Sequence, residues 1–188
     1  MLFTSTTRPF VILAVFGLLS TGFVFGETVT SRQLEMEKEG VKLIGHLERA
    51  ARDIGCAADR LNVWAGDVHF SRQARYYHLE QIKSLVNEGL RPALKRLTEI
   101  QPQLPAWQQD AIDQMLASAK ALAADTNSAI LNQNYAGALP IVHNVEYKEL
   151  ISSVYENAIA LVETSNAAGD YGAAHQQAVE AGLRVPRQ

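Results

Sequence analysis

Apolar residues recur at alternating spacings of three and four along four long segments of this chain, and this spacing constrains the fold more than any other feature. In the first segment, from Gln33 to about Ala65, they are Ile44, Leu47, Ala51, Ile54, Ala58, Leu61, Ala65 and Val68. This spacing places them on one face of an amphipathic helix. Charged residues such as Glu48 and Arg52 fall on the opposite face. The apolar face therefore needs partner helices to be buried.

Three further segments repeat the pattern. Ser71 is a suitable N-cap for the second helix, whose apolar face is Leu79, Ile82, Val86, Leu90, Ala93, Leu97 and Ile100. Pro92 removes a hydrogen bond inside this helix, so we expect a kink there. Pro105 suits the first turn of the third helix, whose apolar face is Ile112, Met115, Leu116, Ala119, Leu122, Ala123, Thr126 and Ile130. After a loop at residues 132–144, the fourth shows Tyr147, Ile151, Val154, Ala158, Leu161 and Val162.

Four helices joined by short connections favour an all-α fold, an antiparallel up-down four-helix bundle with coiled-coil-like packing. We assign the bundle to residues 27–168 and a short C-terminal helical tail to residues 169–188. The chain has 188 residues, of which 47% are hydrophobic, and this is enough for one domain with a real core.

The first 26 residues have the composition of a signal peptide. They carry one charged side chain, Arg8, followed by an apolar run from Phe10 to Leu19 and a Gly26 before Glu27. We therefore expect a periplasmic or secreted protein. The alternative is an uncleaved anchor that meets the membrane only through residues 10–25.

The charge balance of the chain argues against nucleic acid as a partner. Removing residues 1–26 takes away Arg8 and no acidic side chain, so the net charge changes from −3 to −4. Binding to phosphates requires clustered cations. The densest basic stretch is Arg91, Lys95 and Arg96, which we interpret as the solvated face of a helix.

The sequence lacks the usual catalytic and cofactor motifs. No Glu-x-x-His pair is present for a di-iron bundle, and the single cysteine excludes covalent haem attachment. Non-covalent haem would need axial His or Met ligands, and Met36 could approach His175 to supply such a pair. We interpret Met36 as ordinary packing and His175 as a solvated tail residue, so no cofactor and no enzymatic activity are expected.

Cys56 occupies the outermost heptad position, f, if Ile44 is placed at a and Leu47 at d. An outward thiol in an oxidising compartment can form a disulfide between two copies of the chain, giving a homodimer. The alternatives are a thiol covered by the tail and a thiol that is simply tolerated at the surface.

An up-down topology brings the turn between the first and second helices to the same end of the bundle as the loop between the third and fourth. We call this the first-turn end. Aromatic and polar residues there form a candidate ligand site consisting of Trp64, Phe70, Tyr76, Tyr77, His78, Tyr135 and Tyr147. A candidate metal set, suited to a borderline ion such as zinc, consists of Asp67, His69, His143 and Glu146. The structural alternative is that the aromatic rings cap an open bundle end and the histidines are solvated.

Two stretches carry a resemblance to known proteins. One is the run from Pro105 to Asp113, and the other is the pattern His78, Leu79, Ile82, Lys83, Val86, Asn87 and Gly89. The chain resembles, from about Trp64 to Val162, a group of exported bacterial helical proteins of unknown function. The resemblance implies export and a helical bundle, but no activity, cofactor or ligand.

Together these features lead us to expect a non-enzymatic binding or interaction module of the cell envelope. Its partner would be an envelope protein or a small ligand. The alternative is a small-molecule or metal-binding bundle with its site at the first-turn end.

Overall fold

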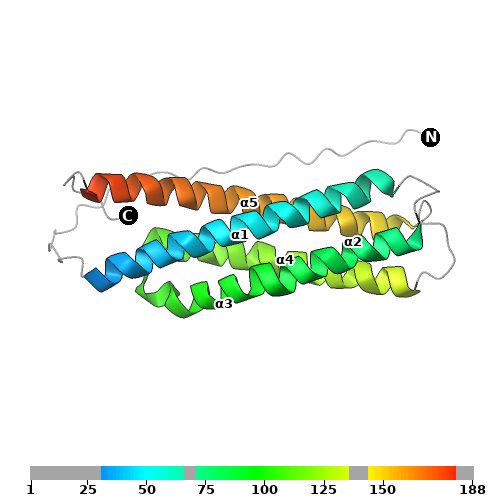
Figure 1. Ribbon diagram of the computed structural model, residues 1–188, viewed down its shortest axis with the longest axis horizontal. Coiled ribbons are helices and arrows are strands. Elements are labelled where there is room, and N and C mark those ends of the chain that lie inside the picture. The colour runs from blue at the N-terminus through cyan, green and yellow to red at the C-terminus, as the bar shows by residue number, and fades with distance from the viewer. Residues whose placement is uncertain (1–30, 66–70, 136–143, 181–188) are drawn as a thin grey trace, which may run out of the picture.

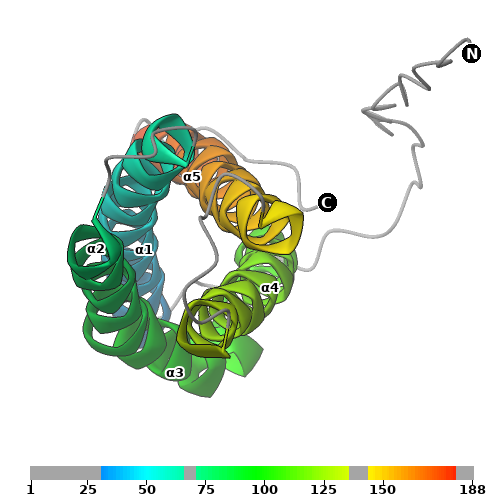
Figure 2. The same cartoon turned by 90° about the vertical axis from the view of Figure 1, so that its right-hand side faces the viewer.

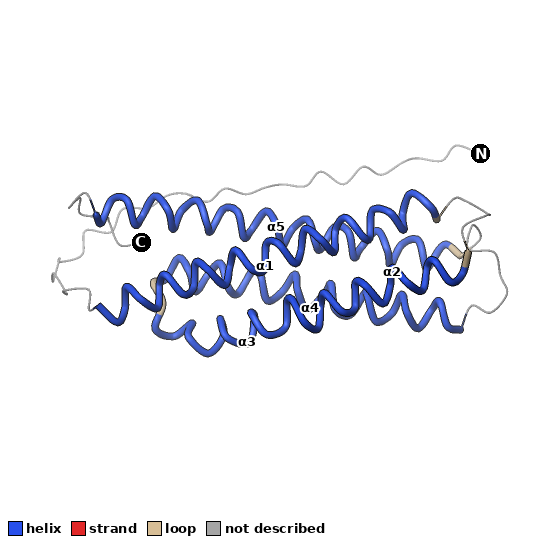
Figure 3. The backbone as a smooth tube through the Cα atoms, viewed as in Figure 1, coloured by secondary structure: helices blue, strands red, loops and turns tan. Residues whose placement is uncertain are grey.

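The computed structural model describes residues 31–65, 71–135 and 144–180. Within these residues every regular element is a helix (Figures 1 and 3). The helices are α1 (Ser31–Trp64), α2 (Arg72–Ser84), the π-helical segment η1 (Leu85–Leu90), α3 (Arg91–Ile100), the 3-10 turn η2 (Gln101–Gln103), α4 (Ala106–Tyr135) and α5 (Val145–Glu180). The predicted all-α class is confirmed. None of the described helices contains a stretch long and apolar enough to cross a membrane.

Four helical columns pack around one core, because α2, η1 and α3 follow one another as a single column. Viewed along the bundle, α1 lies between this column and α5, and α4 lies between α5 and the column on the other side (Figure 2). The predicted four-helix bundle is confirmed. The first-turn end is where α1 and α4 end and α2 and α5 begin, at the right of Figure 1.

The apolar faces predicted for the first and second helices lie in the core of the bundle. All seven apolar residues predicted for the second helix are buried, and so are all those of the first helix up to Ala65. Val68 lies outside the described residues. In α4, Leu116, Ala123 and Ile130 are only partly buried and pack against the edge of the core. Cys56 is exposed, as its heptad position predicts.

An irregular π-helical segment, Leu85–Leu90, lies on the N-terminal side of Pro92. The backbone N–H of Arg91 donates to the carbonyl of Val86, five residues back, at the end of the π-helical segment. The wider turn absorbs the irregularity that a proline introduces into a helix. Gly89, in this segment, packs against α1, and a Cβ atom built on it would lie 3.0 Å from the Cβ of Ala50.

Helix boundaries differ from the prediction at three places. The helix α4 continues to Tyr135, so residues 132–135 of the predicted loop are helical. α4 begins at Ala106, and Pro105 precedes it as the residue whose carbonyl accepts from the N–H groups of Gln108 and Gln109. α5 continues without a break through Gly169 to Glu180. The described part of the predicted tail is therefore the last three turns of the fourth helix, while residues 181–188 lie outside the described residues.

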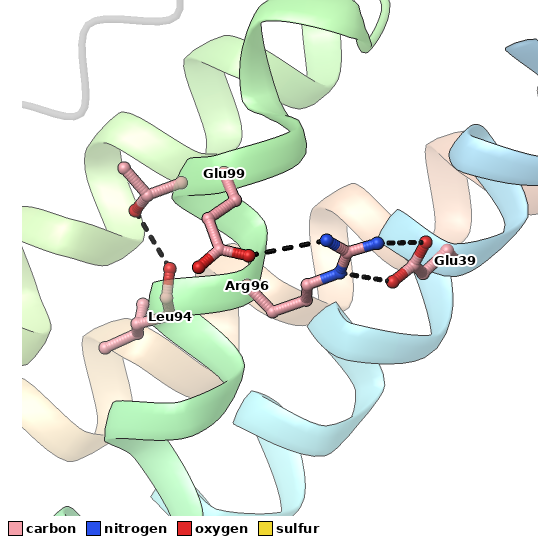
Figure 4. Close-up of polar contacts among 5 residues, drawn as sticks. Glu39, Leu94, Arg96 and Glu99 are labelled. Carbon is pink, nitrogen blue, oxygen red and sulfur yellow. Dashed lines mark hydrogen bonds and ion pairs between the residues drawn. The ribbon is translucent and has the colours of Figure 1, made fainter.

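An ion pair on the surface joins the second column to α1. Arg96 of α3 donates from Nε and Nη2 to the two carboxylate oxygens of Glu39 of α1, at 2.7 and 3.1 Å (Figure 4). Its Nη1 also lies 3.4 Å from Oε2 of Glu99, one turn along α3. Arg91, Lys95 and Arg96 are all exposed, which confirms that the basic stretch is a solvated face.

Candidate functional site

Side-chain hydrogen bonds cap the starts of α2 and α5 at the first-turn end. Ser71 accepts from the N–H of Ala74 and so caps α2, as predicted. Asn144 caps α5 by accepting from the N–H of Tyr147, and its amide donates to Asn132 of α4 at 2.7 Å. These caps satisfy N–H groups that a helix start leaves without intrahelical partners. They also fix the positions of the aromatic residues on the adjoining turns.

Three of the predicted ligand residues come together here. The ring of His78 lies 5.3 Å from that of Trp64, the last residue of α1, and 5.4 Å from that of its neighbour Tyr77. These centroid distances are typical of packed aromatic pairs. Trp64 and His78 are partly buried, whereas Tyr77 is exposed. The three rings therefore form a shallow aromatic surface rather than an enclosed pocket lining.

Tyr147 has a different role from the other predicted ligand residues. Its side chain is fully buried in the core, and its hydroxyl has no hydrogen-bond partner among the described residues. Burial raises the pKa of Tyr147 well above its ordinary value, and the nearby Arg75 opposes this only in part. Burial also lowers the pKa of Arg75. Tyr147 is thus a core residue and not part of the aromatic surface.

The remaining predicted residues are placed only in part. Asp67, His69, Phe70 and His143 lie outside the described residues, as does the side chain of Tyr135, the last residue of α4. Tyr76 and Glu146 are exposed, and Glu146 lies in the first turn of α5, where a carboxylate complements the helix dipole. Within the described ranges, no three His, Cys, Asp or Glu side chains gather in a group that could hold a metal ion.

The first-turn end carries most of the exposed large hydrophobic side chains of the described chain. Five of the six lie there: Val63, Tyr76, Tyr77, Leu131 and Val145. They come from all four columns, and Val63, Tyr77 and Val145 are 68%, 67% and 64% exposed. Exposed apolar side chains that gather in one region are typical of an interaction surface.

The sequence analysis missed a second cluster, at the opposite end, where α3 ends and α4 begins. We call this the α3–α4 end, and we call Glu37, Trp107, Gln108, Tyr171 and His175 the Glu37 cluster. Glu37 of α1 is buried, with 7% of its side chain exposed, and its Oε1 lies 2.9 Å from Nδ1 of His175 on α5. The interpretation of His175 as a solvated tail residue is therefore wrong, because α5 extends far enough to bring it against α1.

Gln108 and Trp107, at the start of α4, complete this cluster. Nε2 of the fully buried Gln108 donates to the backbone carbonyl of Glu37 at 3.1 Å. The ring of Trp107 lies 4.9 Å from that of Tyr171 and 6.3 Å from that of His175. Three helices thus meet around one buried carboxylate.

These polar residues would have been identified by extending the predicted apolar faces further along each helix. Extending the α1 stripe back from Ile44 by four and then three residues reaches Gly40 and Glu37, and extending the α4 stripe back from Ile112 by four reaches Gln108. On α5, the same spacing continues from Leu161 through Ser165, Ala168 and Gly172 to His175. A charged or amide residue on a face that must be buried is the informative signal.

Comparisons with protein-family models, with curated proteins and with solved structures found no match to this chain.

Proposed function

We propose that this protein is exported and that its helical bundle acts as a non-enzymatic interaction module of the cell envelope, binding an envelope protein through the first-turn end. The observation that carries the proposal is the gathering of five exposed apolar side chains at that end. Aromatic residues such as Tyr77 are enriched at protein interfaces, where they bury a large area at little entropic cost.

Export rests on the composition of residues 1–26. Cleavage after Gly26 gives a mature chain that begins at Glu27, a few residues before α1. In this proposal the membrane is met only through residues 10–25, and only in a chain that keeps them.

The proposal is tested by purifying the protein from its native envelope with whatever remains bound. Replacing Val63 and Tyr77 by serine removes two of the most exposed apolar side chains and should abolish co-purification of the partner. Tyr171→Ser is the matched control, since it removes an exposed tyrosine at the opposite end. Equal recovery of a partner with all of these variants would contradict the proposal.

A small-molecule site at the same end is the second candidate. The observation that favours it is the contact of the rings of Trp64, His78 and Tyr77. This candidate predicts an increase in melting temperature with a small ligand in the absence of any protein partner. Loss of that increase in Trp64→Leu, but not in Trp107→Leu, would assign the ligand to the first-turn end.

A further inference from the structure

The Glu37 cluster gathers buried polar atoms that have no hydrogen-bond partner among the described residues. They are Oε1 of Glu37, Oε1 of Gln108, Nδ1 of His175 and Nε1 of Trp107. The contact between Glu37 and His175 is short enough for an ion pair, but it is not aligned as a hydrogen bond. Buried polar atoms are almost always paired, so the unpaired amide oxygen of Gln108 and indole N–H of Trp107, beside the buried carboxylate of Glu37, point to a bound group that pairs with them.

The chemistry of these four atoms favours a cation. A carboxylate and an amide oxygen only accept hydrogen bonds, and Nδ1 of His175, 2.9 Å from Oε1 of Glu37, faces that carboxylate favourably only as an N–H donor. A neutral His175 leaves the negative charge of the carboxylate in place. Trp107 supplies a second donor. Removing a carboxylate from water is costly unless a positive charge or several donors lie beside it. A cation with several N–H groups satisfies the charge and the acceptors together.

The surroundings of the carboxylate favour an organic cation over a metal ion. Only two ionisable groups that bind metals meet here, and the described residues supply no third. The aromatic rings of Trp107 and Tyr171 lie beside them, and the ring of Tyr171 is stacked on that of His175 with centroids 6.4 Å apart. Aromatic faces attract ammonium groups and also cover the apolar body of an organic ligand.

We propose that the Glu37 cluster binds a small organic cation through a primary ammonium group. The ammonium donates to the carboxylate of Glu37 and to Oε1 of Gln108, and it lies against the rings of Trp107 and Tyr171. The ligand enters beside Tyr171 and His175, whose exposed fractions of 37% and 21% make them the accessible part of the cluster. This site is independent of the interaction surface at the first-turn end.

Two glycines hold the binding groups in place. A Cβ on Gly40 would lie 3.2 Å from both amide atoms of Gln108, and one on Gly172 would lie 2.9 Å from Cη2 of Trp107. The amide and the indole therefore pack directly on the backbones of α1 and α5. Close packing of this kind fixes the two side chains before a ligand arrives, which lowers the entropic cost of binding.

Tryptophan fluorescence gives a direct test, because the chain has two tryptophans. Trp64→Phe leaves Trp107 as the only tryptophan, and this variant is the background for titration with n-propylammonium chloride. We expect a saturable change in emission. Tetramethylammonium, which has no N–H group, should bind at least several-fold more weakly. A linear response without saturation, or equal affinity for the two cations, would overturn the proposal.

Charge-neutralising variants then locate the site. Glu37→Gln should weaken propylammonium binding roughly tenfold or more, since hydrogen bonds to charged groups contribute about 1.5–3 kcal/mol. Glu35→Gln is the matched control, because it removes the same charge from an exposed position on the same helix. If Glu37→Gln does not fold by circular dichroism, Tyr171→Leu provides the second variant and should also weaken binding. Equal losses in the Glu35 control, or saturation by zinc chloride but not by propylammonium, would refute the assignment.

Discussion

At the scale of single residues, the buried Tyr147 combines an apolar ring with a polar hydroxyl. Tyr147 is fully buried, yet its hydroxyl has no partner among the described residues. Its ring fills core volume, whereas its oxygen has lost its hydration without a described replacement. The ring and the hydroxyl therefore act on stability in opposite directions, and two substitutions separate them.

Tyr147→Phe should raise the free energy of unfolding by about 1 kcal/mol, because it removes a desolvated hydroxyl and keeps the ring. Tyr147→Ala should lower it by about 3–5 kcal/mol, because it leaves a large cavity. Urea denaturation of the two variants measures both changes. A clear loss of stability in Tyr147→Phe would show that the hydroxyl has a hydrogen-bond partner in the native state.

Glu39 gives a prediction about pH. The hydrogen bonds from Arg96 are the main cause of the lowered pKa of Glu39, and burial opposes them only in part. A carboxylate whose pKa is lower in the folded than in the unfolded chain stabilises the fold above its ordinary pKa of 4.5, and this stabilisation is lost as the pH falls through the folded value.

Arg96→Met should therefore raise the pKa of Glu39 toward 4.5 and remove that part of the acid dependence. Carboxyl-carbon chemical shifts followed through an acid titration measure the change. Lys95→Met, one residue away and also exposed, is the control. An unchanged pKa in Arg96→Met would mean that the ion pair in Figure 4 does not persist in solution.

At the scale of the helix, glycines have different effects according to what lies beside them. Gly45 in α1 has open space where a Cβ would be, whereas a Cβ on Gly172 in α5 would lie 2.9 Å from Trp107 and 3.1 Å from Val41. Gly45→Ala should stabilise the protein by about 0.5–1 kcal/mol through helix propensity. Gly172→Ala should destabilise it by about 1–3 kcal/mol through overpacking. Thermal unfolding compares them, and stabilisation by both would show that Trp107 does not pack on α5.

Periodicity predicted the helices and their buried faces because each face is a local property of the sequence. The stripe from Leu79 to Ile100 is buried as predicted, although Pro92 and the π-helical segment interrupt the regular helix. The end of the fourth helix was predicted too early. Gly169 and Gly172 weaken the helical pattern locally, but packing of α5 along α1 and α4 sustains the helix to Glu180.

The candidate sites were less predictable because they depend on contacts between distant residues. Chain direction alone placed Trp64 and His78 at one end, where their rings do meet. No local pattern reports that His175 reaches Glu37, because that contact requires the full lengths of α1 and α5. Tyr147 was placed both on the apolar face of the fourth helix and in the candidate ligand site, since an aromatic residue near a helix start fits a core and a binding surface equally well, and its burial agrees with the first placement.

The whole molecule is polarised along its long axis. The first-turn end exposes apolar side chains from all four columns, and the α3–α4 end buries a carboxylate, an amide and a histidine. The alternating direction of the helices brings ends of all four columns to each pole. The central claim of our account is that the apolar pole is the surface through which the protein binds its partner.

Site-specific photo-crosslinking in living cells tests this claim most directly. A photoreactive phenylalanine analogue is placed at Tyr77 in one strain and at Tyr171 in another, so that the two probes replace exposed tyrosines at opposite poles. Our account predicts a discrete protein adduct from position 77 and none from position 171. Adducts of the same protein from both positions, or an adduct from position 171 alone, would contradict it.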